Sequence, residues 1–330
     1  MGNIYYFSEQ TEPGKDAGFK ARVDVENIVS GRYTPLYPYK NRNNRLSQML
    51  QLFREMRKVN KDDYILVQYP LVTFNKIAKH IMKSKKIILL IHDLNELRFG
   101  KAVTTEEKQV IDKAVAIISH NSKMTEYLKG HGISGEKIFN LDIFDYLAEM
   151  KPAADHTDDE CCMCFAGNLE KSTFIYNLPK NTTALGFNAY GINYKEDKNA
   201  DINYMGSFEP SELLDVLKGR FGLVWDGEKC DTCSGCLGNY MRYNNPHKLS
   251  MYIAAGIPVI VWSESAAADF VKSKNIGFSV GSLAEIPEII EKMDKDKYLA
   301  YRDNTLKIRE QIIQGESLKR ILDAVEKYIA

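Results

Sequence analysis

The residues best suited to bind an anion lie in the run YNNPHKLSMYIAAGIPVIVW, from Tyr243 to Trp262. Asn245 can cap a helix, because its side-chain oxygen accepts a hydrogen bond from a free N–H of the first turn. Pro246 suits the first helical position, where no N–H is needed. Lys248 then lies beside unpaired N–H groups and the positive end of the helix dipole. This combination predicts a phosphate or diphosphate site. The alternative is an ordinary helix–strand unit with a solvated lysine.

The helix that carries this site is predicted to continue to Ala255. Gly256 can adopt the left-handed conformation that ends a helix. The apolar, β-branched run Ile257–Val261 that follows is typical of a strand buried on both faces.

A second group of polar residues follows the predicted strand Ile87–Ile91, in the segment His92–Arg98 (HDLNELR). Polar side chains at the carboxyl end of a parallel strand are where α/β domains place their chemistry. A carboxylate or histidine there could deprotonate a hydroxyl. The alternative is an aspartate cap with surface charges. Ser119-His120-Asn121 (SHN), after the next strand, is a weaker corner of the same kind.

Six cysteines form two groups. Cys230, Cys233 and Cys236 have the spacing C-x2-C-x2-C of a metal or cluster half-site, and the others are clustered at 161, 162 and 164. A metal site needs about four converging ligands, whereas the second group alternates between the faces of a strand. Free thiols are therefore favoured over a metal or redox site.

The elements that must position these residues alternate between strand and helix, which indicates parallel sheets covered on both faces. Strands are predicted in the first half at 3–8, 64–68, 87–91, 114–119 and 137–144, and helices at 19–28, 46–59, 75–82, 104–111 and 123–129. The first strand leads into a loop with Gly14, Lys15, Asp16 and Gly18, a weak signal for a ligand loop.

The second half repeats this alternation after a polar linker at 151–160. Strands are predicted there at 161–166, 183–187, 221–226, 257–261 and 277–280, and the segment 203–208 precedes a helix that opens at Glu209. Further helices are predicted at 287–293 and 298–327. Two doubly wound domains, the second with an anion-binding helix start, are typical of the GT-B fold. The predicted domains are residues 1–152, completed by the C-terminal helix at about 312–330, and residues 160–311.

The charge distribution is uneven, although the 330-residue chain has no net charge. Between Arg32 and Lys86 there are thirteen Lys or Arg against three acids. The region is either a solvated basic surface or a contact with an anionic membrane or a lipid-diphosphate-linked acceptor. No signal peptide or run of about 20 apolar residues is visible, so we expect a cytoplasmic protein, attached to a membrane at most peripherally. Nothing in the total charge demands nucleic acid.

The chain resembles bacterial β-1,6-galactofuranosyltransferases of surface-polysaccharide synthesis, and more distantly GT-B glucosyltransferases that extend adhesin glycans. The resemblance covers nearly the whole length. It rests on DAGFKAR, IHDLNELR, ISHN, IFDYL, AGNLEKSTFIY, GSF, GLVWDG, TCSG and the run from Tyr243 to Trp262, all in order. It implies transfer of galactofuranose from UDP-galactofuranose to a hydroxyl of a growing glycan. A UDP-glucose-dependent enzyme of the same fold is the alternative, and a non-catalytic nucleotide-sugar-binding module or a Cys-metal protein is the alternative from another class.

The resemblance also implies site residues. The C-terminal domain would bind UDP, with Asn245 and Lys248 of the N-x-x-K motif in contact with it, beside Asn244 and His247. The predicted secondary nucleotide contacts are Gly167, Asn168, Lys171 and Ser207. GT-B enzymes generally work without a bound metal, so neither a metal nor another cofactor is expected.

Two departures from common GT-B patterns bear on mechanism. Met251 occupies the position where many GT-B enzymes have a ribose-binding glutamate, and no E-x7-E pair of the retaining type is present. An inverting enzyme is therefore expected, in which one group deprotonates the acceptor. The candidates for that base, in order of preference, are Asp93, His92, Glu96 and Asp16. The acceptor sugar, the linkage and the oligomeric state are open at this point.

Overall fold

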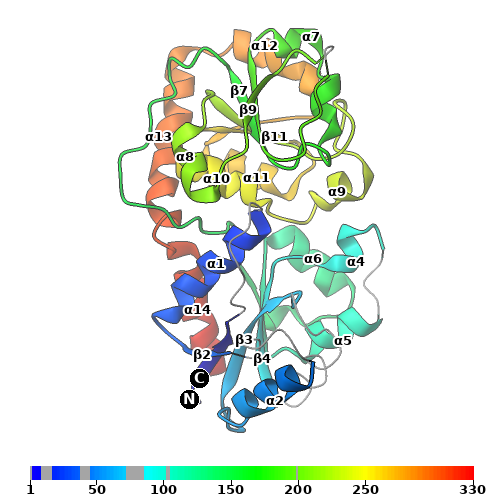
Figure 1. The fold of residues 1–330 in the computed structure, drawn as a ribbon, viewed down its shortest axis with the longest axis vertical. Coiled ribbons are helices and arrows are strands. Elements are labelled where there is room, and N and C mark those ends of the chain that lie inside the picture. Colours follow the sequence, from blue (N-terminus) through cyan, green and yellow to red (C-terminus); the bar gives the residue numbers. More distant parts are fainter. Residues whose placement is uncertain (1, 9–16, 38–44, 72–84, 102–104, 198–199) are drawn as a thin grey trace. The chain divides into compact units, whose positions relative to one another are not determined.

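The chain folds into two α/β units, each built on its own six-stranded parallel sheet (Figure 1). The computed structural model describes all residues except 1, 9–16, 38–44, 72–84, 102–104 and 198–199. The N-terminal unit comprises 1–13, 21–141 and 317–330, and the C-terminal unit comprises 14–20 and 142–316. The observed division between the units falls at 141/142, whereas the predicted domains met at 152–160.

The sheet of the N-terminal unit has the order β2-β1-β3-β4-β5-β6. Its central strands are apolar runs such as KIILLI in β4, whose last five residues are buried, as expected for strands covered on both faces. The strands are β1 (Ile4–Phe7), β2 (Thr34–Leu36), β3 (Tyr64–Tyr69), β4 (Lys86–Ile91), β5 (Ala116–Ser119) and β6 (Ile138–Asn140). The predicted strands 3–8, 64–68, 87–91, 114–119 and 137–144 overlap five of these, and β2 was not predicted.

Helices cover both faces of this sheet, with α1 and α14 on one side and α5 and α6 on the other (Figure 1). The described helices are α1 (Ala17–Ser30), α2 (Arg45–Met56), α4 (Asn95–Arg98), α5 (Thr105–Lys113), α6 (Ser122–Gly130), the 3-10 turn η1 (Gly135–Lys137) and α14 (Glu316–Ile329). The helix predicted at 75–82 lies outside the described residues. The short helix α4 forms within the polar HDLNELR segment, where no helix was predicted.

The sheet of the C-terminal unit has the order β12-β11-β10-β7-β8-β9. The strands are β7 (Met163–Ala166), β8 (Phe187–Tyr190), β9 (Asn203–Gly206), β10 (Phe221–Val224), β11 (Val259–Trp262) and β12 (Gly277–Val280). The chain order reverses between β7 and β10, which pair in parallel. Open α/β sheets bind ligands outside the carboxyl ends of the strands at such a switch point.

The helices of this unit are η2 (Thr173–Asn177), α7 (Lys180–Thr183), α8 (Pro210–Val216), α9 (Gly235–Tyr240), α10 (His247–Ala255), α11 (Ala266–Lys274), η3 (Leu283–Glu285), α12 (Ile286–Glu291) and α13 (Lys295–Ile312). The strand predicted at 183–187 was placed too early, since α7 occupies its start and β8 begins at Phe187. The helix predicted at 298–327 is interrupted between α13 and α14, where Gly315 has a φ of 78°.

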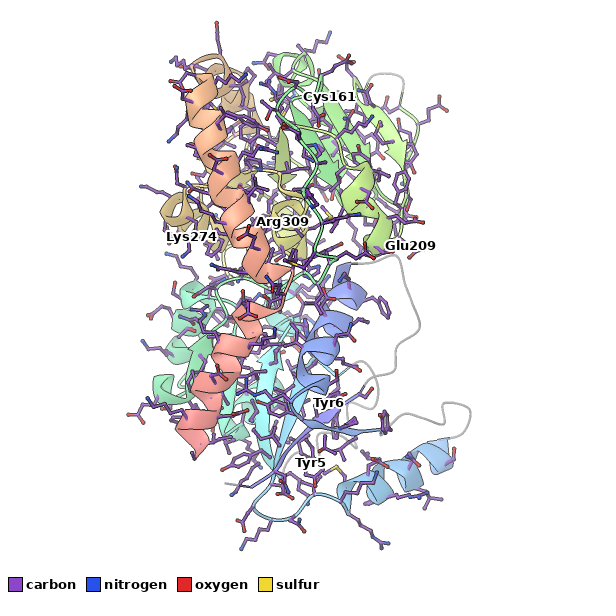
Figure 2. The ribbon with its side chains drawn as sticks, turned by 90° about the vertical axis from the view of Figure 1, so that its left-hand side faces the viewer. Tyr5, Tyr6, Cys161, Glu209, Lys274 and Arg309 are labelled. Atoms are coloured by element: carbon purple, nitrogen blue, oxygen red, sulfur yellow. The ribbon has the colours of Figure 1, made fainter. Side chains whose placement is uncertain are left out.

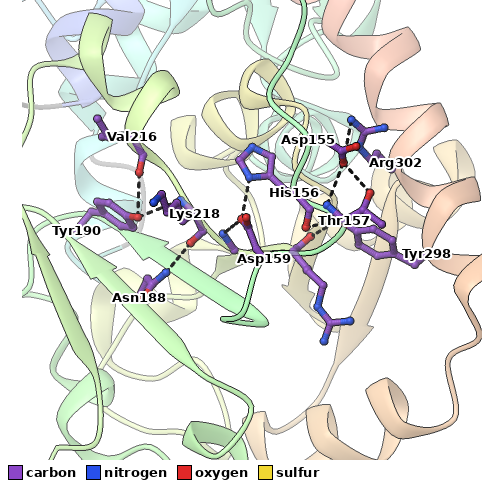
Figure 3. Close-up of polar contacts among 12 residues, drawn as sticks. Asp155, His156, Thr157, Asp159, Asn188, Tyr190, Val216, Lys218, Tyr298 and Arg302 are labelled. Atoms are coloured by element: carbon purple, nitrogen blue, oxygen red, sulfur yellow. Dashed lines mark hydrogen bonds and ion pairs between the residues drawn. The ribbon is translucent and has the colours of Figure 1, made fainter.

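The segment predicted as a polar linker packs against the C-terminal unit instead of crossing open solvent (Figure 3). The His156 ring is buried and lies 2.9 Å from the Asp159 carboxylate, which also accepts a 2.6 Å hydrogen bond from the Gly219 N–H. Arg302 of α13 forms an ion pair with Asp155. These contacts explain why the unit begins before this segment.

In the part of the chain that the structure describes, no helix combines the length and apolar character required to cross a membrane.

Candidate functional site

The helix start predicted to bind an anion is present, one residue later than expected. Helix α10 begins at His247, and Pro246 rather than Asn245 occupies the capping position. Proline has no side-chain acceptor, so the cap we expected from Asn245 at this position is wrong. The Asn245 amide instead donates a 2.8 Å hydrogen bond to the Asp142 carbonyl. At the other end, Gly256 caps the helix with a φ of 79°, as predicted.

The depth of α10 in the unit is set by Tyr252. Its hydroxyl accepts a 2.8 Å hydrogen bond from the Ala166 N–H at the end of β7. Its ring lies over Gly222 of β10, where an added Cβ would come within 2.2 Å of it. Ser250 donates a further 2.7 Å hydrogen bond to the Phe144 carbonyl. The helix is therefore held directly over the two strands that flank the switch point.

The other end of α10 is tied to α13. Arg309, labelled in Figure 2, donates hydrogen bonds of 2.8 Å to the carbonyls of Ala254 and Lys151. A cation at the carboxyl end of a helix also complements the helix dipole. Met251, at the position of the ribose-binding glutamate in many GT-B enzymes, is buried in the apolar core.

Lys248 extends from the first turn of α10 to the carboxyl end of β10. Its ammonium group donates hydrogen bonds of 2.9 Å to the Trp225 carbonyl and 2.8 Å to the Asp226 carboxylate. It also lies 4.7 Å from the centre of the Phe165 ring in β7. The lysine is therefore held at the switch point between β7 and β10. Asp226 was not predicted as a site residue, although its place at the end of a buried strand was a usable signal.

Two polar atoms near the start of α10 have no hydrogen-bond partner within the described residues, Oδ1 of Asn244 and Nε2 of His247, and both are buried. The His247 ring stacks on Tyr146, with ring centres 5.1 Å apart. Burial, reinforced by the charge of Lys20, lowers the pKa of His247 to about 3, so the ring is neutral at physiological pH. Buried polar atoms normally have a hydrogen-bond partner. A ligand bound at this helix start could provide a partner for both atoms.

The predicted secondary contacts lie at other strand ends of the same unit. Gly167 and Asn168 follow β7, and the Asn168 side chain accepts hydrogen bonds from the Glu170 N–H and the Asn193 amide. Lys171 is exposed, and half-buried Ser207 follows β9. Gly167 lies at the carboxyl ends of β7 and β10, as Lys248 does, whereas Ser207 follows β9, two strands away from β7.

In the N-terminal unit, the predicted acceptor corner follows β4. Asp93 forms a 2.7 Å ion pair with Arg98 of α4, so this helix fixes the carboxylate. The His92 Nε2 atom lies 2.6 Å from the Gln68 side-chain oxygen. Glu96 is half-buried on α4, and Asp16 lies outside the described residues.

A buried carboxylate beside this corner escaped prediction. Glu107 of α5 accepts hydrogen bonds from the Tyr69 hydroxyl at 3.0 Å and the Asn95 N–H at 3.1 Å. Burial raises the pKa of Glu107 in spite of these bonds. No signal in the sequence distinguished it, because it lies in a polar helix far along the chain from its partners.

The Ser119-His120-Asn121 corner has a structural role. Asn121 caps α6 by accepting from the Met124 N–H, and Ser119 bonds to the side chains of Thr125 and Asn140. The His120 ring is buried against the Ile91 carbonyl, and burial lowers its pKa to about 4.

The cysteines are free thiols. Cys230 lies 3.3 Å from the Asn177 carbonyl, and burial raises its pKa to about 11, while Cys236 is exposed. Among the described residues, no three or more His, Cys, Asp or Glu side chains are grouped so that they could hold a metal ion.

Comparison with known proteins agrees with this architecture. The family model described as "Glucosyltransferase 3-like, N-terminal domain" matches residues 4–143, and the corresponding C-terminal domain model matches 163–325. The chain is 33% identical over 336 residues to the β-1,6-galactofuranosyltransferase WbbI of Escherichia coli K12, with 98% of each chain covered. It is 26% identical over 286 residues to glucosyltransferase 3 of Streptococcus gordonii, with 83% of each covered.

Solved structures show the same fold at low sequence identity. A sucrose-phosphate synthase from Thermosynechococcus elongatus superposes with a TM-score of 0.65 at 10% identity, over 99% of both chains. Anabaena Alr3699/HepE in complex with UDP-glucose superposes with a TM-score of 0.60 at 12% identity, over 99% of this chain and all of that one. The chain therefore belongs to the glucosyltransferase 3-like family and is a glycosyltransferase with the GT-B fold.

Proposed function

We propose that the enzyme is an inverting transferase that moves galactofuranose from UDP-galactofuranose to a hydroxyl of a growing surface glycan. The observation that carries the donor site is the position of Lys248, on the first turn of α10 and at the switch point of the sheet. The donor sugar is proposed because the relative named a β-1,6-galactofuranosyltransferase matches over almost the full length of both chains.

The chemistry requires positive charge where the diphosphate leaves. The Lys248 ammonium and the free N–H groups of α10 would receive the negative charge that develops as the bond to the sugar breaks. The buried, unpartnered atoms of Asn244 and His247 lie at the same helix start and would complete the nucleotide site. Because these groups supply the charge stabilisation, we propose that the reaction proceeds without a metal ion. Full activity in excess EDTA would support this step.

The acceptor hydroxyl must lose a proton as it attacks. Asp93 is the proposed base, since Arg98 holds its carboxylate at the carboxyl end of β4. His92 is the next candidate, followed by Glu96 and Asp16. The acceptor is proposed to be a glycan on a lipid diphosphate, with the enzyme at the cytoplasmic face of the membrane, in peripheral contact through the basic region 32–86.

A second donor has specific support. The streptococcal relative is named a glucosyltransferase, and the HepE structure holds UDP-glucose, so UDP-glucose is the competing donor for the same site. Incubating the enzyme with each UDP-sugar and a short galactoside or glucoside acceptor distinguishes them. Turnover of UDP-glucose with none of UDP-galactofuranose would overturn the proposed donor, and binding of UDP without turnover of any donor would indicate a non-catalytic module.

The donor site itself is tested by Lys248→Ala. Removing one charge-assisted hydrogen bond is expected to weaken UDP binding about 10- to 100-fold and to lower kcat about 100-fold or more. Calorimetry with UDP and a coupled UDP-release assay measure the two effects. Lys292→Ala, at an exposed ion pair on the same unit, is the matched control. Unchanged UDP affinity in Lys248→Ala would remove this residue from the site.

A further inference from the structure

Helix α2 of the N-terminal unit and the turn directly after it carry an exposed stripe of two apolar and two basic side chains. Leu50 is 64% exposed and Phe53 is 53% exposed, although both are large and apolar. Arg54 and Arg57 are exposed beside them. Arg57 continues the helical turn, because its N–H donates a 3.2 Å hydrogen bond to the Phe53 carbonyl. The spacing 50, 53, 54 and 57 therefore places all four residues on one side. We refer to these four residues as the α2 stripe.

The opposite side of α2 is fixed in the unit, so the stripe cannot turn inward. Leu52 and Met56 are buried in the apolar core together with Val59. Glu55 is buried and accepts hydrogen bonds from the Tyr37 N–H and the Lys58 ammonium. Apolar residues on both sides of one helix are expected where one side packs on the core and the other meets a second apolar phase.

The charges around the stripe indicate what that phase is. Three other described basic residues of the region are neutralised within the unit, since Arg32 pairs with Asp323 and Glu326, Lys58 with Glu55, and Lys86 with Asp62. Arg54 and Arg57 form no ion pair with any described residue, and the one acid of α2 is the buried Glu55. The exposed stripe therefore presents apolar surface together with uncompensated positive charge.

We propose that the α2 stripe docks the enzyme onto an anionic lipid bilayer. Leu50 and Phe53 enter the boundary between headgroups and acyl chains, and Arg54 and Arg57 bind lipid phosphates, as in interfacial amphipathic helices. A second copy of the chain fits the α2 stripe less well, because a symmetric contact through the stripe would place the arginines of the two copies against each other and their positive charges would repel. This inference rests on the proposed peripheral location and specifies the element and the lipid class. It can be tested without the sugar donor or the acceptor.

The experiment is co-sedimentation of the full-length protein with phosphatidylcholine vesicles containing 0 or 30% phosphatidylglycerol, in 50 mM and 500 mM NaCl. The wild type is expected to bind the anionic vesicles at low salt and to be released at high salt, where the Debye length falls to a few ångströms. Arg54→Ala with Arg57→Ala is expected to weaken binding about 25-fold, or roughly fivefold for each charge. Leu50→Ser with Phe53→Ser is expected to weaken it at least about tenfold.

The control variant is Lys272→Ala with Lys274→Ala, which removes two exposed lysines of α11 and should bind as the wild type does. Thermal unfolding confirms that every variant is folded, and light scattering reports its oligomeric state. The inference is overturned if the wild type does not bind anionic vesicles, or if both stripe variants bind as tightly as the wild type. A dimer that dissociates in the Leu50/Phe53 variant, without vesicle binding, would instead identify the stripe as a contact between copies. Turnover of a water-soluble acceptor by the stripe variants tests the proposed function separately.

Discussion

At the scale of single residues, local rules predicted that Lys248 lies on the first turn of a helix, but not which groups surround it. The helix start was predicted only to within one residue, because Asn245, of a type that favours capping positions, instead donates to the Asp142 carbonyl far earlier in the chain. The partner of the lysine, Asp226, lies 22 residues earlier in the chain and reaches it only because β10 and α10 pack together. Glu107 escaped prediction for the same reason, since its contacts to Tyr69 and Asn95 are created by tertiary structure.

The buried His120 makes a prediction about acid stability. Its pKa of about 4 lies below the ordinary value of 6.5, so the unfolded chain binds the proton first. The free energy of unfolding should therefore fall as the pH drops from about 6.5 to about 4, with a loss of roughly 3 kcal/mol from this group.

His120→Gln removes that titration and keeps a donor for the Ile91 carbonyl. Urea unfolding at pH 7.5, 5.5 and 4.5 is expected to show a smaller loss of stability toward low pH in this variant than in the wild type. His131→Gln, at a half-buried ring near the end of α6, serves as the control. Equal losses in His120→Gln and the wild type would show that the ring does not resist protonation.

At the scale of elements, strands with apolar sequences were predictable and short elements held by tertiary contacts were not. The run Ile87–Ile91 gave β4 to within one residue, since burial on both faces requires such a sequence. In contrast, β2 contains Pro35 and is only three residues long, and it exists because it pairs with β1 at the sheet edge. The C-terminal helix was predicted as one piece, although Gly315 divides it into α13 and α14.

The packing of α10 on β10 predicts a strong effect of one methyl group. In Gly222→Ala, the new Cβ would lie 2.2 Å from the Tyr252 ring, so the helix must shift. We expect a loss of about 3 kcal/mol in the free energy of unfolding, measured by urea denaturation.

Two further variants isolate the cause of that loss. Gly31→Ala is the matched control, because an added Cβ there meets no atom within 4 Å. When Tyr252→Ala is already present, adding Gly222→Ala should cost little more. If Gly222→Ala were as mild as Gly31→Ala, the ring contact would not set the depth of α10.

At the scale of the whole molecule, the pattern of alternating elements predicted two doubly wound units, because each half contains enough strands for its own parallel sheet. The exact division could not be predicted, since the polar composition of 151–160 concealed the buried contacts of His156 and Asp159. The assignment of 312–330 to the N-terminal unit was close, as the observed unit includes 317–330.

The two tryptophans of the chain, Trp225 and Trp262, are both buried in the C-terminal unit. Tryptophan fluorescence therefore reports the unfolding of that unit alone. A ligand present at 100 times its Kd stabilises its site by about 2.7 kcal/mol, so UDP should move the fluorescence midpoint in urea upward. Circular dichroism, which also detects the helices of the N-terminal unit, should retain a component that UDP does not move. Coincident curves by both methods, with and without UDP, would show that the units unfold as one.

The contact between Lys248 and Asp226 has a consequence for how the enzyme responds to salt. When a lysine without an acidic partner binds a diphosphate, a new pair of opposite charges forms. The affinity of such a site for the diphosphate falls steeply as the salt concentration rises. Here the lysine already has a carboxylate partner at 2.8 Å, so binding of the donor would exchange one anion for another. Affinity for the donor should consequently vary little with ionic strength. The Asp226 carboxylate would compete with the diphosphate for Lys248 and would pair with the lysine again when the nucleotide leaves.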